Sequence, residues 1–148
     1  MEEITLILTA TSDLSSETAT QIFTVIFIDG CGDVTLSPPG FSDIIGEAEL
    51  YATERFFFTE SEANVQNCGA ISYRILDENT GLELPSPDFT IDLSGNIPFV
   101  QVQATSPIYA QNSPYALVIE ASIDNYATVE SEPLELIIND PCFDTQLI

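Results

Sequence analysis

The residues of this sequence that could do chemistry are mainly carboxylates and cysteines. The chain contains 24 Asp and Glu, two Arg, three Cys, no His and no Lys. The usual general bases near neutral pH are therefore missing. Paired carboxylates could still hydrolyse glycosidic bonds, but no Trp is present to form a sugar platform. Zinc binding is not expected either, because no CxxC or Cys/His spacing occurs. We therefore predict that the protein is not an enzyme.

The charge balance restricts the partners of the chain. Its formal net charge is −22 at pH 7, so it should repel nucleic acid and anionic membrane surfaces. It should attract basic partners or divalent cations such as calcium. The simpler alternative is that the charge keeps a long extracellular polymer soluble. No segment reaches the roughly 18 apolar residues that span a bilayer, so we expect no membrane insertion by this segment.

The pattern Asp-x-Cys-x-Asp occurs twice, at Asp29–Asp33 and at Asp140–Asp144. The two occurrences align without a gap, and the same offset extends the match back to Ile4 and Tyr115. Over the 36 positions from residue 1 to residue 36 there are eight identities with the sequence 111 residues later, where chance would give roughly two or three. The sequence therefore predicts a repeat, with one full period running from residue 29 to residue 139.

The repeat explains the odd number of cysteines. Cys142 is the next copy's equivalent of Cys31, so each period holds two cysteines, Cys31 and Cys68. In an oxidising compartment these two could close a disulfide loop. Cys142 would then pair with a Cys68 equivalent in the next unit or in another subunit. Two buried thiols remain the alternative.

The hydrophobic pattern that must position these residues indicates strands. Alternating or continuous apolar runs, bounded by Gly, Pro and polar turns, recur along the chain. About seven to nine short strands at this spacing predict an all-β, antiparallel β-sandwich. The segment Asp33–Ser37 is expected to be one of the strands. Residues 42–56 could instead form a helix capped by Ser42, but the β-rich neighbours favour strands.

The repeat also divides the chain. Residues 1–28 are expected to be the last two strands of a preceding repeat, residues 29–139 a complete repeat, and residues 140–148 the start of the next one. The segments 4–28 and 115–139 should then form similar hairpins.

Several motifs of the period resemble known extracellular repeats. The motifs, in chain order, are "DGC" (Asp29–Cys31), "NCGAISYRI" (Asn67–Ile75), "FTIDLSGNIPFVQV" (Phe89–Val102), "YALVIEASIDNY" (Tyr115–Tyr126) and "LELIINDPC" (Leu134–Cys142). The sequence resembles the tandem Ig-like and cadherin-like (dystroglycan-type) repeats of large extracellular surface proteins, most closely those of ciliated protists. The resemblance implies an Ig-like or cadherin-like β-sandwich at the cell surface or outside the cell, in a stalk, coat, fibre or adhesive role. The resemblance assigns no catalytic residues to this chain.

The same resemblance raises calcium as a ligand. In cadherin-like arrays calcium binds at unit boundaries through oxygen ligands from both neighbours. The corresponding carboxylates here are Asp29, Asp33, Asp140 and Asp144. Solvated acidic loops are the alternative for these residues. A second acidic group near turns, with the same two interpretations, comprises Asp77, Glu78, Asp88 and Asp92. A glycan is the other candidate ligand, with stacking on Tyr51, Tyr73, Tyr109 or Tyr126.

The first two strands also predict assembly. An isolated hairpin of residues 1–28 would be marginal in water, and its edges invite pairing. We therefore expect a head-to-tail linear homopolymer or tandem array. Phe57 is a candidate contact residue, because the alternation in "RFFFTE" places it on the face opposite Phe56 and Phe58.

Overall fold

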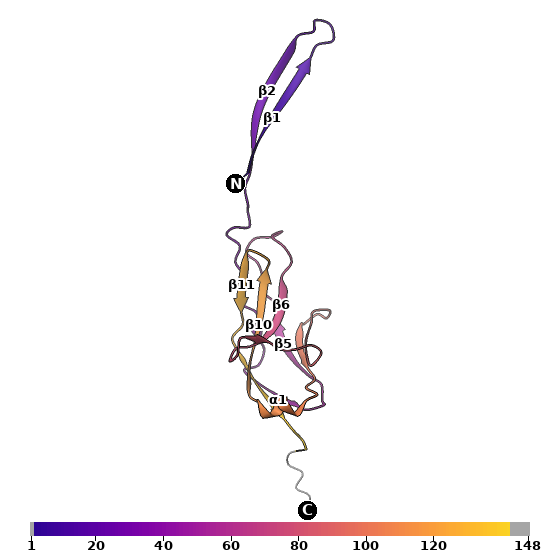
Figure 1. The fold of residues 1–148 in the computed structure, drawn as a ribbon, viewed down its shortest axis with the longest axis vertical. Helices are drawn as coiled ribbons and strands as arrows, with labels where there is room; N and C mark the ends of the chain where they lie inside the picture. The colour runs from indigo at the N-terminus through magenta and orange to yellow at the C-terminus, as the bar shows by residue number, and fades with distance from the viewer. Residues whose placement is uncertain (1, 143–148) are drawn as a thin grey trace, which may run out of the picture. The chain divides into compact units, whose positions relative to one another are not determined.

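The computed structural model describes residues 2–142 and divides the chain into two compact units, one ending at Asp33 and one starting at Val34. The first unit is an antiparallel hairpin of β1 (Glu2–Thr11) and β2 (Thr18–Phe27), which pair along their whole length (Figure 1). The N–H of Ser12 donates to the carbonyl of Glu17 over 2.9 Å and closes the loop. The two strands predicted for this segment are thus present.

The second unit contains two sheets. In spatial order the first sheet comprises β3 (Gly40–Phe41), β5 (Glu54–Thr59), β9 (Phe99–Val102) and β8 (Phe89–Asp92). In spatial order the second comprises β4 (Ile45–Glu49), β12 (Leu134–Asn139), β10 (Tyr115–Ile123), β6 (Ser72–Asp77) and β7 (Leu82–Glu83), with β11 (Ala127–Glu130) also paired to β10.

The order of these strands is that of an Ig-like β-sandwich. The first, second, fourth and fifth strands of such a fold share one sheet in the order ABED, and the third, sixth and seventh form the other. Here β3, β5, β9 and β8 take the places A, B, E and D, while β6, β10 and β12 take C, F and G. The prediction of an all-β Ig-like sandwich is confirmed.

One strand pair differs from the antiparallel arrangement that the sequence predicted. β12 pairs parallel with β4, from Glu135 opposite Ile45 to Asn139 opposite Glu49. The chain leaves β3 in one sheet at Phe41 and enters β4 in the other sheet at Ile45. Because the chain crosses to the other sheet at this point, β4 lies beside β12, the last strand, and runs in the same direction as β12.

The core lies between the two sheets. Phe58, Leu117, Leu134 and Leu136 are almost completely buried there, and Val100 joins them from β9. On β5 the side chains of residues 56 and 58 point into this core, whereas Phe57 points outward and is 43% exposed. The alternation predicted for this strand is confirmed, because successive side chains of a strand point to opposite faces.

Two local predictions were wrong. The segment Asp33–Ser37 is not a strand but makes a single bridge from Leu36 to Ala63. A short helix, α1 (Pro107–Gln111), stands where no helix was predicted; its proline occupies the first turn, where a missing N–H does least harm. The helix considered for residues 42–56 is absent, since β4 and β5 occupy this segment.

Candidate functional site

The β1–β2 hairpin reproduces the pairing of β10 with β12 one repeat period earlier. Three consecutive residue pairs of the first hairpin match three pairs of the second when the numbering is shifted by the offset that relates Ile4 to Tyr115. The sequence of a single strand does not determine this pairing register. The pairs in the first unit are Ile4 with Val25, Thr5 with Thr24, and Leu6 with Phe23; those in the second are Tyr115 with Leu136, Ala116 with Glu135, and Leu117 with Leu134. The two segments are therefore equivalent in backbone pairing as well as in sequence.

The equivalence ends towards the tips of the hairpins. In the second unit β12 is preceded by Pro133 and by a separate strand, β11, whose pairing with β10 begins at Glu120 opposite Glu130. The continuous register of the first hairpin would instead place residue 131 opposite residue 120. The interruption is thus a one-residue shift, as in a β-bulge, and the predicted similarity of the hairpins holds at their open ends.

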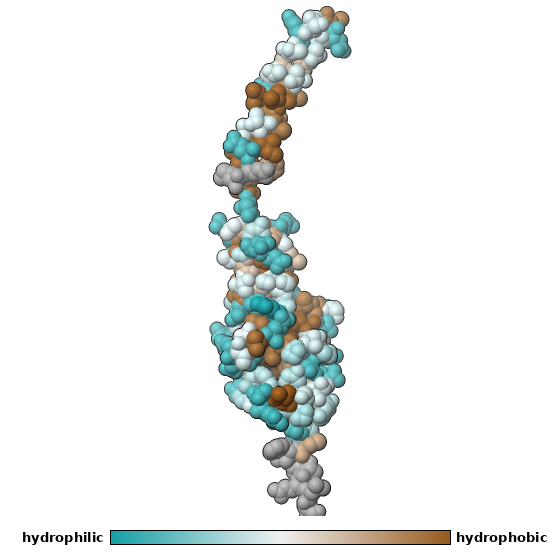
Figure 2. All heavy atoms as spheres, viewed as in Figure 1, coloured by the Kyte–Doolittle hydropathy of each residue, from teal (hydrophilic) through white to brown (hydrophobic). Residues whose placement is uncertain are grey.

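One side of the hairpin carries an apolar surface, which we call the hairpin face. It consists of Ile4, Leu6, Leu8, Phe23, Val25 and Phe27, which share one side because paired residues of antiparallel strands lie on the same face. Leu6, Leu8 and Phe27 are 43%, 64% and 53% exposed. Figure 2 shows brown, apolar side chains gathered along this hairpin.

The equivalent residues of the second unit are all buried. Residues 6 and 8 correspond to Leu117 and Ile119, which are 0% exposed, and residue 27 corresponds to Ile138, which is 3% exposed. These three belong to the sandwich core. In the part of the chain that the structure describes, the hairpin face therefore has the composition of a core-forming surface, although its side chains are largely exposed.

The two Asp-x-Cys segments form the same local turn. The N–H of Cys31 donates to Oδ1 of Asp29 over 2.9 Å, and the N–H of Cys142 donates to Oδ1 of Asp140 over 2.9 Å. In both turns an oxygen of the first carboxylate is therefore used by the backbone. Asp33 is exposed, and Asp144 lies outside the described residues. Across residues 2–142 no group of three or more Asp, Glu, Cys or His side chains is placed to hold a metal ion.

A disulfide joins Cys31 to Cys68. Cys68 is 8% exposed and lies in the loop that leads into β6. The bond was proposed from the repeat, which assigns these two cysteines to one period. Cys142, the equivalent of Cys31, is exposed.

The outward face of β5 and β9 carries an aromatic contact. The ring of Phe57 meets the ring of Phe99 edge-on with centroids 5.8 Å apart, and the guanidinium of Arg55 lies 4.6 Å from the centroid of Phe99. A cation over an aromatic face is attracted by the ring quadrupole. The sequence singled out Phe57 but not Phe99, because the pairing of β5 with β9 that joins these two residues is non-local.

The second acidic group of the sequence separates into distinct turns. Asp77 is buried and accepts hydrogen bonds from the Thr80 hydroxyl, 3.1 Å, and the Asn79 amide, 3.3 Å. Asp92 accepts from the hydroxyl and the N–H of Ser94, and these bonds lower the pKa of its carboxyl. These carboxylates therefore stabilise turns.

Asp88 connects β8 to α1. Its Oδ2 accepts the hydroxyl proton of Tyr109 over 2.9 Å, and its Oδ1 accepts that of Thr105 over 2.8 Å. Burial, together with the hydrogen bond to Asp88 and the charge of Asp88, raises the pKa of Tyr109 to about 12. The Tyr109 hydroxyl thus ties α1 to the residue that precedes β8. Its contact with Asp88 spans 21 residues, and no local pattern indicated it.

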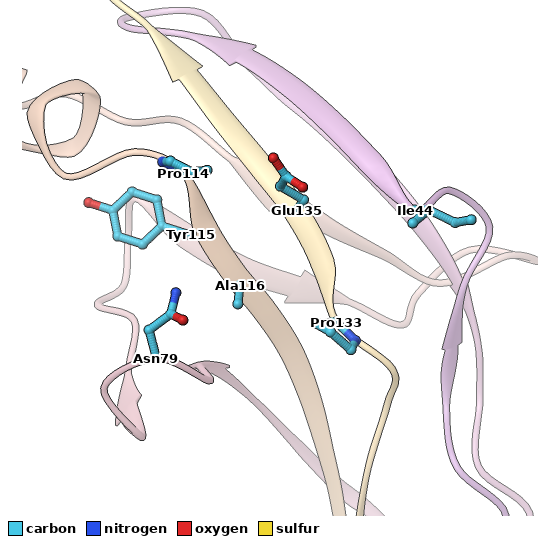
Figure 3. A pocket seen from close by; sticks show the side chains of 7 residues that line it. All are labelled: Ile44, Asn79, Pro114, Tyr115, Ala116, Pro133 and Glu135. Carbon is cyan, nitrogen blue, oxygen red and sulfur yellow. The ribbon is translucent and has the colours of Figure 1, made fainter.

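A small cavity of about 310 Å³ lies where β10 and β12 begin (Figure 3). Its lining comes from four segments: Ile44 ahead of β4, Asn79 in the turn after β6, Pro114 to Ala116 at the start of β10, and Pro133 with Glu135 at β12. Burial raises the pKa of the Tyr115 phenol, whose oxygen also hydrogen-bonds the Asn112 side chain. The lining is mostly apolar, and the side chains in it that carry polar groups are Asn79, Tyr115 and Glu135.

Comparisons with known proteins complete this description. No family model matches the sequence. No curated protein matches it. Among solved structures, the chain is similar to the N-terminal Ig1-2 module of the Drosophila receptor protein tyrosine phosphatase DLAR, with 13% identity and a TM-score of 0.46 over 74% of this chain and 52% of that one. The chain thus spans about half the length of the solved chain that it matches. Across residues 2–142 no helix is long and apolar enough to cross a membrane.

Proposed function

We propose that the protein is a structural or adhesive module of the extracellular space, in which Ig-like repeats follow one another head to tail in a linear fibre, stalk or coat. The observation that carries this proposal is the hairpin face. Five of its six residues are exposed and Val25 is half-buried, although their equivalents one period later form the core of the sandwich. A two-stranded sheet with such a face is marginal in water and tends to pair with another sheet.

The repeat supplies the direction of assembly. In this proposal residues 1–28 are the last two strands of a preceding repeat, residues 29–139 are a complete repeat, and residues 140–148 begin the next one. Each junction then joins two different surfaces. Contacts of this kind generate an open, linear array and not a closed dimer.

The disulfide and the charge support the extracellular setting. Disulfides persist in oxidising compartments, and the bond between Cys31 and Cys68 closes a long loop within the repeat. By the same logic Cys142 would pair with the Cys68 equivalent of the following unit. A net charge of −22 keeps such an array soluble and away from nucleic acid.

Phe57 is the proposed lateral contact of the module. It is a large apolar side chain that is 43% exposed on the outer face of a sheet, beside Arg55. Arg55 is one of only two cations in the chain, and the other, Arg74, is paired with Glu120. A cation next to an exposed aromatic ring suits an acidic partner surface, which a neighbouring array of the same repeat offers.

The proposal is tested with arrays built from one, two and three successive periods of this sequence. Small-angle X-ray scattering should show a maximum dimension that increases in proportion to the number of periods. Beads coated with the arrays should aggregate if the module is adhesive, and Phe57→Ser should weaken this aggregation. Arrays whose maximum dimension does not increase with each added period would contradict the head-to-tail proposal.

A further inference from the structure

The hairpin face has the features of a surface that pairs with a partner, and the inference drawn from it rests on the proposed head-to-tail function. We propose that it is covered by another repeat of the same type that lacks its own last two strands, a segment equivalent to residues 34–114. That segment contributes one strand equivalent to β6 and one equivalent to β4, and together with β1 and β2 it forms a complete sandwich.

The second unit shows what such a partner must provide. There β10 pairs antiparallel with β6, from Leu117 opposite Asp77 to Ser122 opposite Ser72. On the other side of the same hairpin, β12 pairs parallel with β4. The second unit therefore uses both outer edges of its hairpin as well as the apolar face.

The matching register transfers this pattern to the first unit. In the described residues β1 and β2 form a sheet of two strands, so each has an outer edge available for pairing. The edge of β1 should receive an antiparallel strand along Leu6–Thr11, the equivalents of residues 117–122. The edge of β2 should receive a parallel strand along residues 24–28, the equivalents of 135–139.

Other occupants satisfy fewer of these requirements. Two hairpins packed face to face would cover the apolar residues but leave the outer strand edges unpaired, and such edges invite further pairing. The closed second unit of another copy cannot serve, because its β4 and β6 are already paired with β12 and β10. An anionic lipid surface is disfavoured by the net charge of −22.

The experiment extends the full chain with the proposed partner. A copy of residues 34–114 is placed directly before Ile4, so that Ile4 takes the position of Tyr115 and the spacing of the repeat is preserved. Amide hydrogen exchange is then compared between this extended chain and the original chain. Backbone amides of β1 and β2 should exchange at least on the order of 100-fold more slowly in the extended chain. The reason is that the hydrogen bonds of a folded sheet open only in larger unfolding events.

Matched variants show whether the hairpin face is responsible. Leu6→Ser with Phe23→Ser in the extended chain should abolish the added protection, whereas Thr5→Ser with Thr24→Ser on the opposite side should preserve it. Amides of β10 in the second unit serve as an internal reference, since their protection should be unchanged in every variant. This reference separates loss of the partner from general misfolding.

Two results would overturn the inference. In the first, the amides of β1 and β2 exchange as fast in the extended chain as in the original chain, and the added segment is unfolded. The other is an original chain whose hairpin becomes protected with increasing concentration, which would identify hairpin pairing or fibre formation between whole copies. The second result would leave the proposed linear assembly standing. Conversely, arrays whose maximum dimension does not increase with each period would contradict the linear assembly, but they would not change the hydrogen-exchange comparison.

Discussion

Cys142 donates its backbone N–H to Oδ1 of Asp140 over 2.9 Å. The same bond, with the same length, joins Cys31 to Asp29 one period earlier. The two turns follow strands with the same pairing register, β12 and β2. The repeat is therefore present in hydrogen bonds and strand register, and its equivalent positions supply matched controls for mutation.

The first prediction compares equivalent leucines of the two hairpins. Leu117→Ala should destabilise the second unit by about 2–5 kcal/mol, because it creates a cavity at a completely buried site. Leu6→Ala, at the equivalent position, should cost less than about 1 kcal/mol in the dilute chain, because Leu6 is 43% exposed. Denaturant unfolding measures both values. Equal losses at the two positions would mean that the hairpin face is already covered.

The second prediction concerns the disulfide. Replacing Cys31 and Cys68 together with Ser should lower the free energy of unfolding by about 3–4 kcal/mol, since the unfolded chain loses the restriction of a long closed loop. Thermal or denaturant unfolding with and without reductant checks the value. Cys142→Ser is the control and should leave the stability of the second unit unchanged. A reductant-insensitive protein would argue against the bond.

The third prediction concerns Gly46 in β4. A Cβ added there would lie 2.4 Å from a ring carbon of Phe56, a contact that cannot persist without movement of this buried ring. Gly46→Ala should therefore cost about 1–3 kcal/mol of stability by overpacking the core. Gly30→Ala, where the added Cβ meets nothing within 4 Å, should stay within about 0.5 kcal/mol of the parent. A neutral Gly46→Ala would show that β4 can shift away from β5.

The fourth prediction is a pH dependence from Tyr109. Its pKa is about 12 in the folded chain against 10.0 for an ordinary tyrosine, so folding favours the protonated phenol. The stabilisation is fully present below about pH 10 and is lost as the pH rises towards 12. Unfolding free energies across this window should fall less steeply in Tyr109→Phe. Asp88→Asn removes the carboxylate charge, so absorbance titration should show Tyr109 ionising at lower pH.

The fifth prediction concerns calcium. The Asp29 and Asp140 carboxylates each use Oδ1 to hold a turn, and residues 2–142 contain no side-chain group suited to a metal ion. Millimolar calcium should therefore shift the melting temperature by less than about 1 °C, whereas an occupied site would stabilise the fold by mass action. The readout is a thermal melt with calcium or with chelator. A larger shift that disappears in Asp29→Asn would establish a junctional calcium site.

Much of the local structure was predictable because strand alternation depends on neighbouring residues alone. The outward Phe57 between two buried phenylalanines and the two strands of the first unit followed from this alternation. The bond between Cys31 and Cys68 was one of two alternatives that the repeat left open. The short helix α1 was missed because the same few residues around Pro107 are compatible with a loop.

The sequence by itself determined the all-β class, the repeat that relates Asp29 to Asp140, and the apolar pattern of both hairpins. Only the tertiary structure decided that β4 runs parallel to β12, that Asp88 holds Tyr109, and that the apolar face of one hairpin is buried while the equivalent face of the other is largely exposed. The physical reason is that side-chain alternation arises from the geometry of a single strand. Burial and pairing instead depend on which distant segment lies opposite, and the sequence of one strand does not contain that information.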